Sequence, residues 1–513
     1  MAILGSILKR TINIGNKFPG TGSRDAWKQQ KRTLRKLLSK AEYTAFGEHY
    51  GFSRILNQKD HVCAFMAAVP VFDYNSIFRS WWYRALNGES FVCWPGQVKY
   101  FALSSGTADA SSKHIPVTRD MLKSIKKTSI RQIFSQAEYN LPETHFEKGI
   151  LMIGGSTHLH FNGAYFEGDL SGITTRNLPF WFQHFYKPGK QISRERDWTA
   201  KLDEIVKNAP NWDIAIICGV PAWIQILLQR IIAHYKLNTI HDIWPNLLVY
   251  VTGGVSFEPY RTGFEKLLSR PLIYMETYLA SEGFIAFQNR PGTEGMKLVT
   301  DNGIFFEFIP YTEDNFDVDG NMVQQPQTLT INEVQENNEY ALLISTCAGA
   351  WRYLLGDIIR FVSMERNEII ITGRTKHFLS LCGEHLSVDN MNRAISLSAQ
   401  EMDIDIKEFS VAGIDYEGMF AHQWYIGTDD RVDPAILKQK IDENLKNLND
   451  DYRVERIAAL KEVFVSVYPT EVFYDFMRKL GKEGGQNKFP RVLKKERLKE
   501  WNKHLTHIKP VHQ

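Results

Sequence analysis

Residues 214–254 read IAIICGVPAWIQILLQRIIAHYKLNTIHDIWPNLLVYVTGG, and this stretch decides the fold class. Two short apolar runs within it, at residues 214–218 and 247–251, end at or beside glycine, as buried strands often do. The helix-like stretch at residues 222–235 falls between them, which is the order that a βαβ unit requires. A third run of the same kind covers residues 149–153. The sequence therefore predicts an α/β fold for the larger part of the chain.

The composition is that of a globular protein. The 513 residues are 43% hydrophobic and 23% charged, unlike a disordered or fibrous chain. At roughly 150 residues per domain, the length fits three domains, or a large α/β domain with a smaller partner domain. The formal net charge of +3 is too small for a general nucleic-acid or membrane-surface binder. We therefore expect neither nucleic acid nor membrane as a partner, and no obligate protein partner.

Targeting and redox signals point to a cytoplasmic protein. Residues 1–18 reach Lys9 and Arg10 after a short apolar run, which is not the order or length of a signal peptide. No segment approaches the ~20 apolar residues of a membrane span. The cysteines lie far apart without metal-ligand spacing, so we expect reduced thiols at Cys63, Cys93, Cys218, Cys347 and Cys382.

A change of pattern at residues 366–376 marks the expected domain boundary, because a strand-like run there meets a small polar turn. Beyond it the pattern predicts strands at residues 409–414, 423–426 and 463–468, and a capped amphipathic helix at residues 433–448. We therefore expect an N-terminal domain at residues 1–373, a hinge at residues 374–376 and a smaller C-terminal α/β domain at residues 377–513.

The first segment that could carry chemistry is LSSGTADASSKHIP, residues 103–116. Small and hydroxyl residues around one glycine can fold their N–H groups and hydroxyls around a phosphate, while Lys113 supplies charge. The spacing differs from that of a Walker loop. The alternative is an ordinary serine-rich surface turn.

The second segment is YMETYLASEG, residues 274–283, about twenty residues after Gly253 and Gly254. An aromatic ring can stack on a purine, a hydroxyl can bond a phosphate or carboxylate, and a nearby carboxylate can hold Mg²⁺. The alternative is a strand end followed by a helix-capping Ser-x-Glu.

The third segment is WRYLLGDIIR, residues 351–360. Its Gly-Asp pair is either a hairpin turn or a site where Asp357 accepts both hydroxyls of a ribose. Residues 373–386, GRTKHFLSLCGEHL, are either a linker with a hairpin or a hinge with a functional arginine. The tail QNKFPR, residues 486–491, lies in a basic run that is most often a solvated terminal helix.

These five segments occur in an order that resembles the adenylate-forming acyl and aryl ligases. Within that superfamily the chain is most similar to the auxin-responsive acyl-acid amido synthetases of plants and their bacterial relatives. That family has the phosphate loop as S-S-G-T, five residues, Lys, and Pro three residues later. The matching motifs are Ser104 to Thr107 with Lys113 and Pro116, Tyr278-x-x-Ser281-Glu282, Tyr353-x-x-Gly356-Asp357 and Gln486-x-Lys488-x-Pro490-Arg491.

The resemblance implies a fold and a set of roles. It implies a large adenylation domain at residues 1–373, a smaller mobile C-terminal domain, and the use of ATP and Mg²⁺. Catalysis would fall to Lys488, Glu282 and Ser281, with Glu282 as the metal ligand. Nucleotide binding would fall to Ser104, Ser105, Gly106, Thr107, Lys113, Gly254, Tyr278, Asp357 and Arg374, with Lys376 in the hinge.

The implied function is an ATP-dependent ligase that joins a small carboxylic acid to an amino acid or another amine through an acyl adenylate. Two alternatives stay open: an acyl-CoA or aryl-CoA ligase, and a nucleotide-binding protein without turnover. Ala110 stands where the family usually has a second glycine, and the segment Gly373-Arg374-x-Lys376 is closer to the hinge of acyl ligases. Intact Glu282, Asp357 and Lys488 favour an enzyme over a mere binder.

Overall fold

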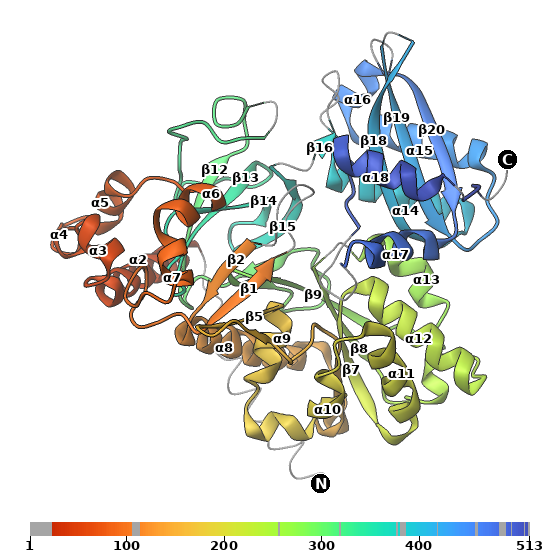
Figure 1. Cartoon of the computed structure of the whole chain (residues 1–513), viewed down its shortest axis with the longest axis horizontal. Coiled ribbons are helices and arrows are strands. Elements are labelled where there is room, and N and C mark those ends of the chain that lie inside the picture. Colours follow the sequence, from red (N-terminus) through yellow and green to blue (C-terminus); the bar gives the residue numbers. More distant parts are fainter. Residues whose placement is uncertain are drawn as a thin grey trace.

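The computed structural model describes residues 23–104, 113–254, 257–317, 320–375, 378–379, 386–417, 419–456, 460–481, 489–493, 495–506 and 508–510. In these residues, helices surround an eleven-stranded sheet in the larger part of the chain, and a smaller part follows with its own three-stranded sheet (Figure 1). This mixed α/β architecture confirms the predicted fold class.

The central sheet has the strand order β12-β13-β14-β15-β11-β10-β9-β8-β7-β3-β6. Strands β9, β8, β7, β3 and β6 pair in parallel, and the other neighbours pair antiparallel. The bounds are β3 Gly149–Met152, β6 Tyr186–Lys187, β7 Ile214–Gly219, β8 Val249–Gly253, β9 Ile273–Ala280, β10 Gly283–Phe287, β11 Met296–Leu298, β12 Ile304–Pro310, β13 Glu339–Thr346, β14 Tyr353–Ser363 and β15 Glu368–Arg374.

The predicted βαβ unit is confirmed by β7, α12 (Pro221–Tyr235) and β8, which pairs in parallel with β7. Pro221 stands at the first position of α12, where its missing N–H has no helical partner to lose. Ile224, Leu228 and Ile231 of this helix are fully buried in one cluster with Tyr250 of β8. The carboxyl ends of β7, β8 and β9 therefore share one edge of the sheet, where open α/β sheets bind ligands.

A second sheet, in the order β2-β1-β5-β4, lies beside the central one (Figure 1). It contains β1 Tyr100–Ser104, β2 Lys113–Val117, β4 His160–Phe161 and β5 Phe166–Gly168. The helices of the larger part are α2 Ser23–Ala41, α3 Ala45–His49, α4 Phe52–Leu56, α5 His61–Ala68, α6 Tyr74–Ile77, α7 Tyr83–Leu86, α8 Arg119–Ser135, α9 Leu170–Arg176, α10 Lys190–Ser193, α11 Trp198–Asn208, α12 and α13 Arg261–Glu265.

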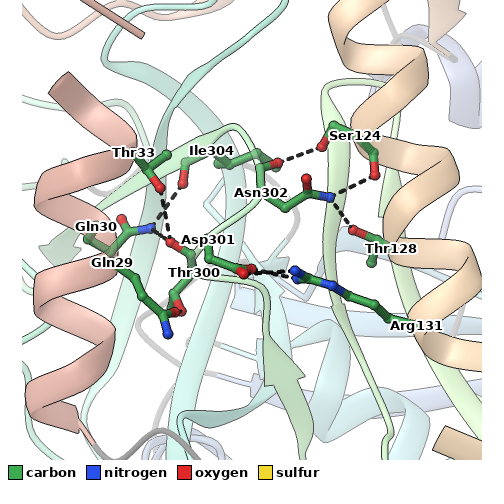
Figure 2. A network of polar contacts seen from close by, with 10 residues as sticks. All are labelled: Gln29, Gln30, Thr33, Ser124, Thr128, Arg131, Thr300, Asp301, Asn302 and Ile304. Atoms are coloured by element: carbon green, nitrogen blue, oxygen red, sulfur yellow. Dashed lines mark hydrogen bonds and ion pairs between the residues drawn. The ribbon is translucent and has the colours of Figure 1, made fainter. Parts of the chain in front are cut away.

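The turn at residues 300–303 joins two helices that are far apart in the sequence (Figure 2). Gln30 of α2 donates its amide to the carbonyls of Thr300 (2.7 Å) and Ile304 (3.0 Å). On the other side, Asn302 donates to the Ser124 carbonyl of α8 at 2.7 Å. These buried bonds fasten α2 and α8 to the β11–β12 connection of the central sheet.

The smaller part contains β16 Phe378–Leu379, β17 Leu386–Ser387, α14 Val388–Met402, β18 Ile406–Tyr416, β19 Met419–Thr428, α15 Pro434–Leu448, α16 Asp450–Glu455, β20 Leu460–Tyr468, α17 Thr470–Lys479 and α18 Lys495–Leu505. The predicted strands and the helix capped by Asp433 are confirmed, since Asp433 accepts the N–H of Ala435. The tail helix α18 is not merely solvated, because Trp501 is fully buried among aromatic rings of α17.

In the described parts of the chain, no helix is both long and apolar enough to cross a membrane. Cys63, Cys93, Cys218 and Cys347 are free thiols, as expected. Cys382 lies outside the described residues. Burial raises the pKa of the Cys218 and Cys347 thiols to about 12, which leaves them as unreactive thiols near neutral pH.

Candidate active site

The candidate site centres on Asp357 in β14, which lies directly opposite Arg374 of β15 in the antiparallel register. The Arg374 Nε donates to Asp357 Oδ1 at 2.5 Å. Asp357 is only 7% exposed, so its charge needs such a partner. The carboxylate, in turn, raises the pKa of the Arg374 guanidinium. The Gly-Asp pair and the hinge arginine belong to two separate segments of the sequence, and the structure brings them together through the contact of Asp357 with Arg374.

The glycine before Asp357 makes this geometry accessible. Gly356 has φ +88°, in the left-handed region that favours glycine, and its carbonyl accepts the N–H of Thr375 at 2.8 Å. Gly356 and Asp357 both lie inside the long strand β14 rather than in a turn. The hairpin-turn alternative for this pair is therefore wrong.

Tyr278 reaches the same carboxylate from β9, because its phenol donates to Asp357 Oδ2. Burial, followed by the charge of Asp357, raises the pKa of this phenol well above its ordinary value. Gly253 of β8 pairs with Thr277 of β9. The residues that follow them, Gly254 and Tyr278, therefore lie near each other at the ends of neighbouring strands, and Gly254 has φ +85°. Thr277 is held from α8, where Gln132 donates to its hydroxyl at 2.6 Å.

Ser281 and Glu282 form the two-residue turn between β9 and β10. They cap no helix, so the helix-cap alternative is wrong. Glu282 is 8% exposed, and burial raises the pKa of its carboxyl to about 6, against the opposing charges of Lys113 and Arg374. The buried Glu282 carboxylate fits the role of a protein ligand for Mg²⁺, which takes one or two carboxylates and completes its shell with phosphates and water.

Lys113 opens β2, directly opposite Ser104 at the end of β1. Its Nζ lies 5.2 Å from the centroid of the Tyr74 ring, and the Tyr74 hydroxyl accepts the N–H of His114 at 2.9 Å. Lys113 therefore stands at the base of the predicted phosphate loop, and its charge lowers the pKa of the Glu282 carboxyl against the effect of burial. The loop residues Ser105, Gly106, Thr107 and Ala110 lie outside the described residues, as do Lys376 and Lys488.

Sequence reasoning missed the residues that brace this site. Arg352, beside the motif residue Tyr353, has φ +41° and forms a buried ion pair with Glu307, with nitrogen–oxygen distances of 2.7–3.1 Å. It also donates to the carbonyls of Met66 and Val69 at 2.7 Å. Burial, followed by the charge of Glu282, raises the pKa of the adjacent Tyr353 phenol well above its ordinary value. Only the motif Y-x-x-G-D pointed here; nothing in the sequence singles out Gln132.

Comparison with known proteins places these residues in context. Sequence profiles of the GH3 family match three segments: the N-terminal domain at residues 21–160, the central domain at residues 297–371 and the C-terminal domain at residues 389–497. Together they match more than half of the chain. The polar network around residues 300–303 joins the first two of these segments physically.

Similar curated proteins include a jasmonoyl–L-amino acid synthetase, JAR4, of Nicotiana attenuata, 21% identical over 66% of this chain and 67% of that one. Another is the indole-3-acetic acid-amido synthetase GH3.4 of Arabidopsis thaliana, 33% identical over 24% of this chain and 20% of that one.

Two solved structures show the same fold. One is the GH3.15 acyl acid amido synthetase, with a TM-score of 0.77 at 16% identity over 96% of both chains. The other is a 2-hydroxyisobutyryl-CoA ligase, with a TM-score of 0.59 at 12% identity over 93% of this chain and 91% of that one.

Proposed function

The chain belongs to the GH3 family, and from that premise we propose that it is an ATP-dependent ligase that joins a carboxylic acid to an amino acid. A carboxylate is a poor acylating agent, so it must first be activated. The acid oxygen attacks the α-phosphorus of ATP, which forms an acyl adenylate and releases pyrophosphate. The amine nitrogen then attacks the acyl carbon, loses a proton and expels AMP, which leaves an amide.

The observation that carries the proposal is the contact of the buried Asp357 carboxylate with Tyr278 and Arg374. Charged hydrogen bonds fix the position of this carboxylate beside Tyr278, which lies near the carboxyl end of β9, at the edge of the sheet where nucleotides bind. In the proposed complex, Asp357 accepts the ribose hydroxyls, and Tyr278 and Arg374 keep it oriented while binding the nucleotide beside it. Gly254, which has φ +85° and follows the end of β8, would lie beside the base.

A second group of residues would bind the ATP phosphates and balance their negative charge. Ser104, Ser105, Gly106 and Thr107 would surround the phosphates, with Lys113 providing a cation next to Glu282. Glu282 would hold Mg²⁺, which when bound neutralises phosphate oxygens and favours departure of pyrophosphate. Ser281, in the same turn, would donate a hydrogen bond to the adenylate.

The C-terminal part would contribute Lys488, whose cation stabilises the negative charge that builds up on the α-phosphate and the attacking carboxylate. We propose that residues 1–373 and 377–513 move as two domains about the hinge at residues 374–376, which contains Lys376. This rotation would withdraw Lys488 after adenylation and admit the amine, a gating step of the kind that mobile lids perform.

Acid-dependent exchange of pyrophosphate into ATP tests the first step across a panel of aliphatic and aromatic acids. Mass detection of products, with an accepted acid and either the twenty amino acids or CoA, tests the second step. We expect exchange with at least one acid and an amide product. Accumulation of acyl-CoA without amide would overturn the amino acid assignment, and absence of exchange with every acid would reject the ligase.

A further inference from the structure

The smaller part of the chain rests on a surface that the proposed chemistry does not use. We call this surface the docking face and define it by Gln225 of α12, Tyr260 of the short helix η7 (Glu258–Tyr260) and Gly263 of α13. Figure 1 shows α12 and α13 where the blue C-terminal part meets the green strands and helices. Trp223 of α12 and Tyr474 of α17 add an aromatic contact, with centroids 6.0 Å apart.

The first polar contact across this surface is made by Arg491. Its Nη2 donates to the Tyr260 hydroxyl at 3.2 Å, while its Nη1 donates to Glu408 of β18 at 2.8 Å. The guanidinium also lies over the Phe409 ring, 4.3 Å from the centroid. Arg491 Nη1 also donates to the Phe409 carbonyl at 3.0 Å. Because its own domain holds Arg491 in these three ways, the guanidinium presents a preformed donor to Tyr260.

The second polar contact is made by Asp405, which precedes β18. Its Oδ2 accepts from the side-chain amide of Gln225 at 2.8 Å, and both side chains are buried. The carboxylate also lies against the backbone of Gly263: a Cβ at position 263 would lie 2.1 Å from Oδ2 and 2.3 Å from Oδ1 of Asp405. Only glycine at position 263 allows this approach without movement.

The residues that make these two contacts are joined by backbone hydrogen bonds within the smaller part of the chain. The Val411 N–H of β18 donates to the Arg491 carbonyl at 2.9 Å, and Leu493 donates back to Val411 at 2.8 Å. The end of the Q-x-K-x-P-R tail is therefore bonded to the same strand that follows Asp405. Arg491 comes three residues after Lys488 in the sequence, which is at most about 10 Å of extended chain.

We propose that the docking face is a latch that holds the C-terminal domain in the orientation used for adenylation, with Arg491 and Asp405 as its positioning residues. The proposal rests on the proposed function, in which Lys488 serves adenylation only. Undocking would leave the active-site groups of the larger domain intact. Loss of the latch is therefore expected to slow the first half-reaction and to spare the second.

Gly263→Ala is the sharpest variant. Alanine suits the interior of a helix better than glycine, so α13 itself gains stability, while the new methyl group collides with Asp405 across the interface. We expect acid-dependent exchange to fall roughly tenfold as the docked population falls. Aminolysis of a supplied acyl adenylate, with the acid identified by the exchange screen, should stay within about twofold of wild type.

Two controls separate docking from local damage. Adding Asp405→Ala to Gly263→Ala removes the colliding carboxylate, so exchange should recover to the level of Asp405→Ala alone. Tyr260→Phe removes an interdomain acceptor, whereas Tyr235→Phe removes a hydroxyl that, among the described residues, bonds the Val206 and Lys207 carbonyls of the larger part. Of these two variants, only Tyr260→Phe should lower acid-dependent pyrophosphate exchange.

Amide hydrogen exchange measures docking independently of enzymatic activity. Peptides that contain residues 258–264 and 404–409 should exchange faster in Gly263→Ala than in wild type. Unchanged hydrogen exchange in these peptides, or an equal loss of rate in both half-reactions, would overturn the latch. A wild-type enzyme that activates no acid would reject the proposed function and the catalytic part of the proposal, while hydrogen exchange would still decide whether this face docks.

Discussion

At the scale of single residues, the proposed site is built from charges that would be costly if unpaired. Asp357 has a phenol on one oxygen and a guanidinium on the other, and Arg352 has Glu307 and two backbone carbonyls. Removing one member of such a set leaves the other buried and uncompensated. The variants below distinguish loss of ligand binding from loss of stability.

Asp357→Asn should cripple nucleotide use, because two charge-assisted ribose hydrogen bonds would become neutral ones. At about 1.5–3 kcal/mol for a hydrogen bond to a charged group, the loss corresponds to tenfold or more in nucleotide affinity. Titration calorimetry with ATP measures the change, and circular dichroism checks the fold. Unchanged affinity in a folded variant would reject the ribose role.

Arg352→Met should mainly destabilise the protein. The change leaves Glu307 charged and buried, and breaking a buried pair in this way costs about 3–5 kcal/mol. Urea unfolding measures the loss, with Lys499→Met as a control, because Lys499 lies on the surface of α18 and is 74% exposed. A loss below about 1 kcal/mol, the range of exposed pairs, would contradict the bracing role.

At the scale of elements, one turn shows how burial decides the value of a contact. Asn302 bonds the Ser124 carbonyl and the Thr128 hydroxyl of α8 in a buried setting, while its neighbour Asp301 pairs with Arg131 on the same helix at the surface (Figure 2). The two contacts join the same two elements and differ in exposure to solvent.

Asn302→Ala is therefore expected to cost about 1–3 kcal/mol of unfolding free energy, because it leaves buried polar groups of α8 unsatisfied. Asp301→Ala should cost less than about 1 kcal/mol, as exposed ion pairs do. Denaturant titration of both variants makes the comparison. Equal costs would mean that the turn does not fasten α8 through Asn302.

The helices and strands also show which features could be predicted from sequence patterns and which could not. The strands at β3, β7 and β8 and the helix α12 could be predicted, because each pattern is local and repeats at a known period. The Gly-Asp pair could not be placed from its own residues. A turn and a strand with one left-handed glycine have the same local composition, and only pairing with β13 and β15 selects the strand.

At the scale of the whole molecule, the two parts of the chain are proposed to divide the reaction between them. Lys488→Ala should lower acid-dependent pyrophosphate exchange by about two to three orders of magnitude, the range for removing one group that stabilises transition-state charge. Aminolysis of supplied acyl adenylate should change little. Lys499→Ala on the surface of α18 serves as the control, and equal losses in both steps would contradict domain alternation.

Docking of the two parts should depend on pH through Asp405. Burial raises the pKa of its carboxyl to about 6, above the ordinary value of 3.8; Lys407, the hydrogen bond from Gln225 and Lys266 oppose the shift, and Asp430 adds to it. The docked form therefore favours the protonated carboxyl, so docking weakens as pH rises through about 4 to 6. Small-angle scattering should show a more compact protein at pH 4.5 than at pH 7.5. Asp405→Asn should abolish the difference.

The sequence by itself determined the fold class and the family, because both are written in local patterns and fixed spacings. The order of the phosphate loop, the Y-x-x-S-E and Y-x-x-G-D motifs and the tail predicted which residues to examine. These motifs lie up to about 380 residues apart in the chain, so their spacing in sequence carries no distances.

Only the tertiary structure decided which of these residues touch. Strand register brings Arg374 opposite Asp357, and the fold of β9 brings Tyr278 to the same carboxylate. The bracing by Arg352 and the docking of Asp405 against Gly263 likewise join residues whose local sequence carries no signal of the partner. Such contacts depend on the packing of whole elements, which is the sum of many weak interactions and is not encoded at any one position.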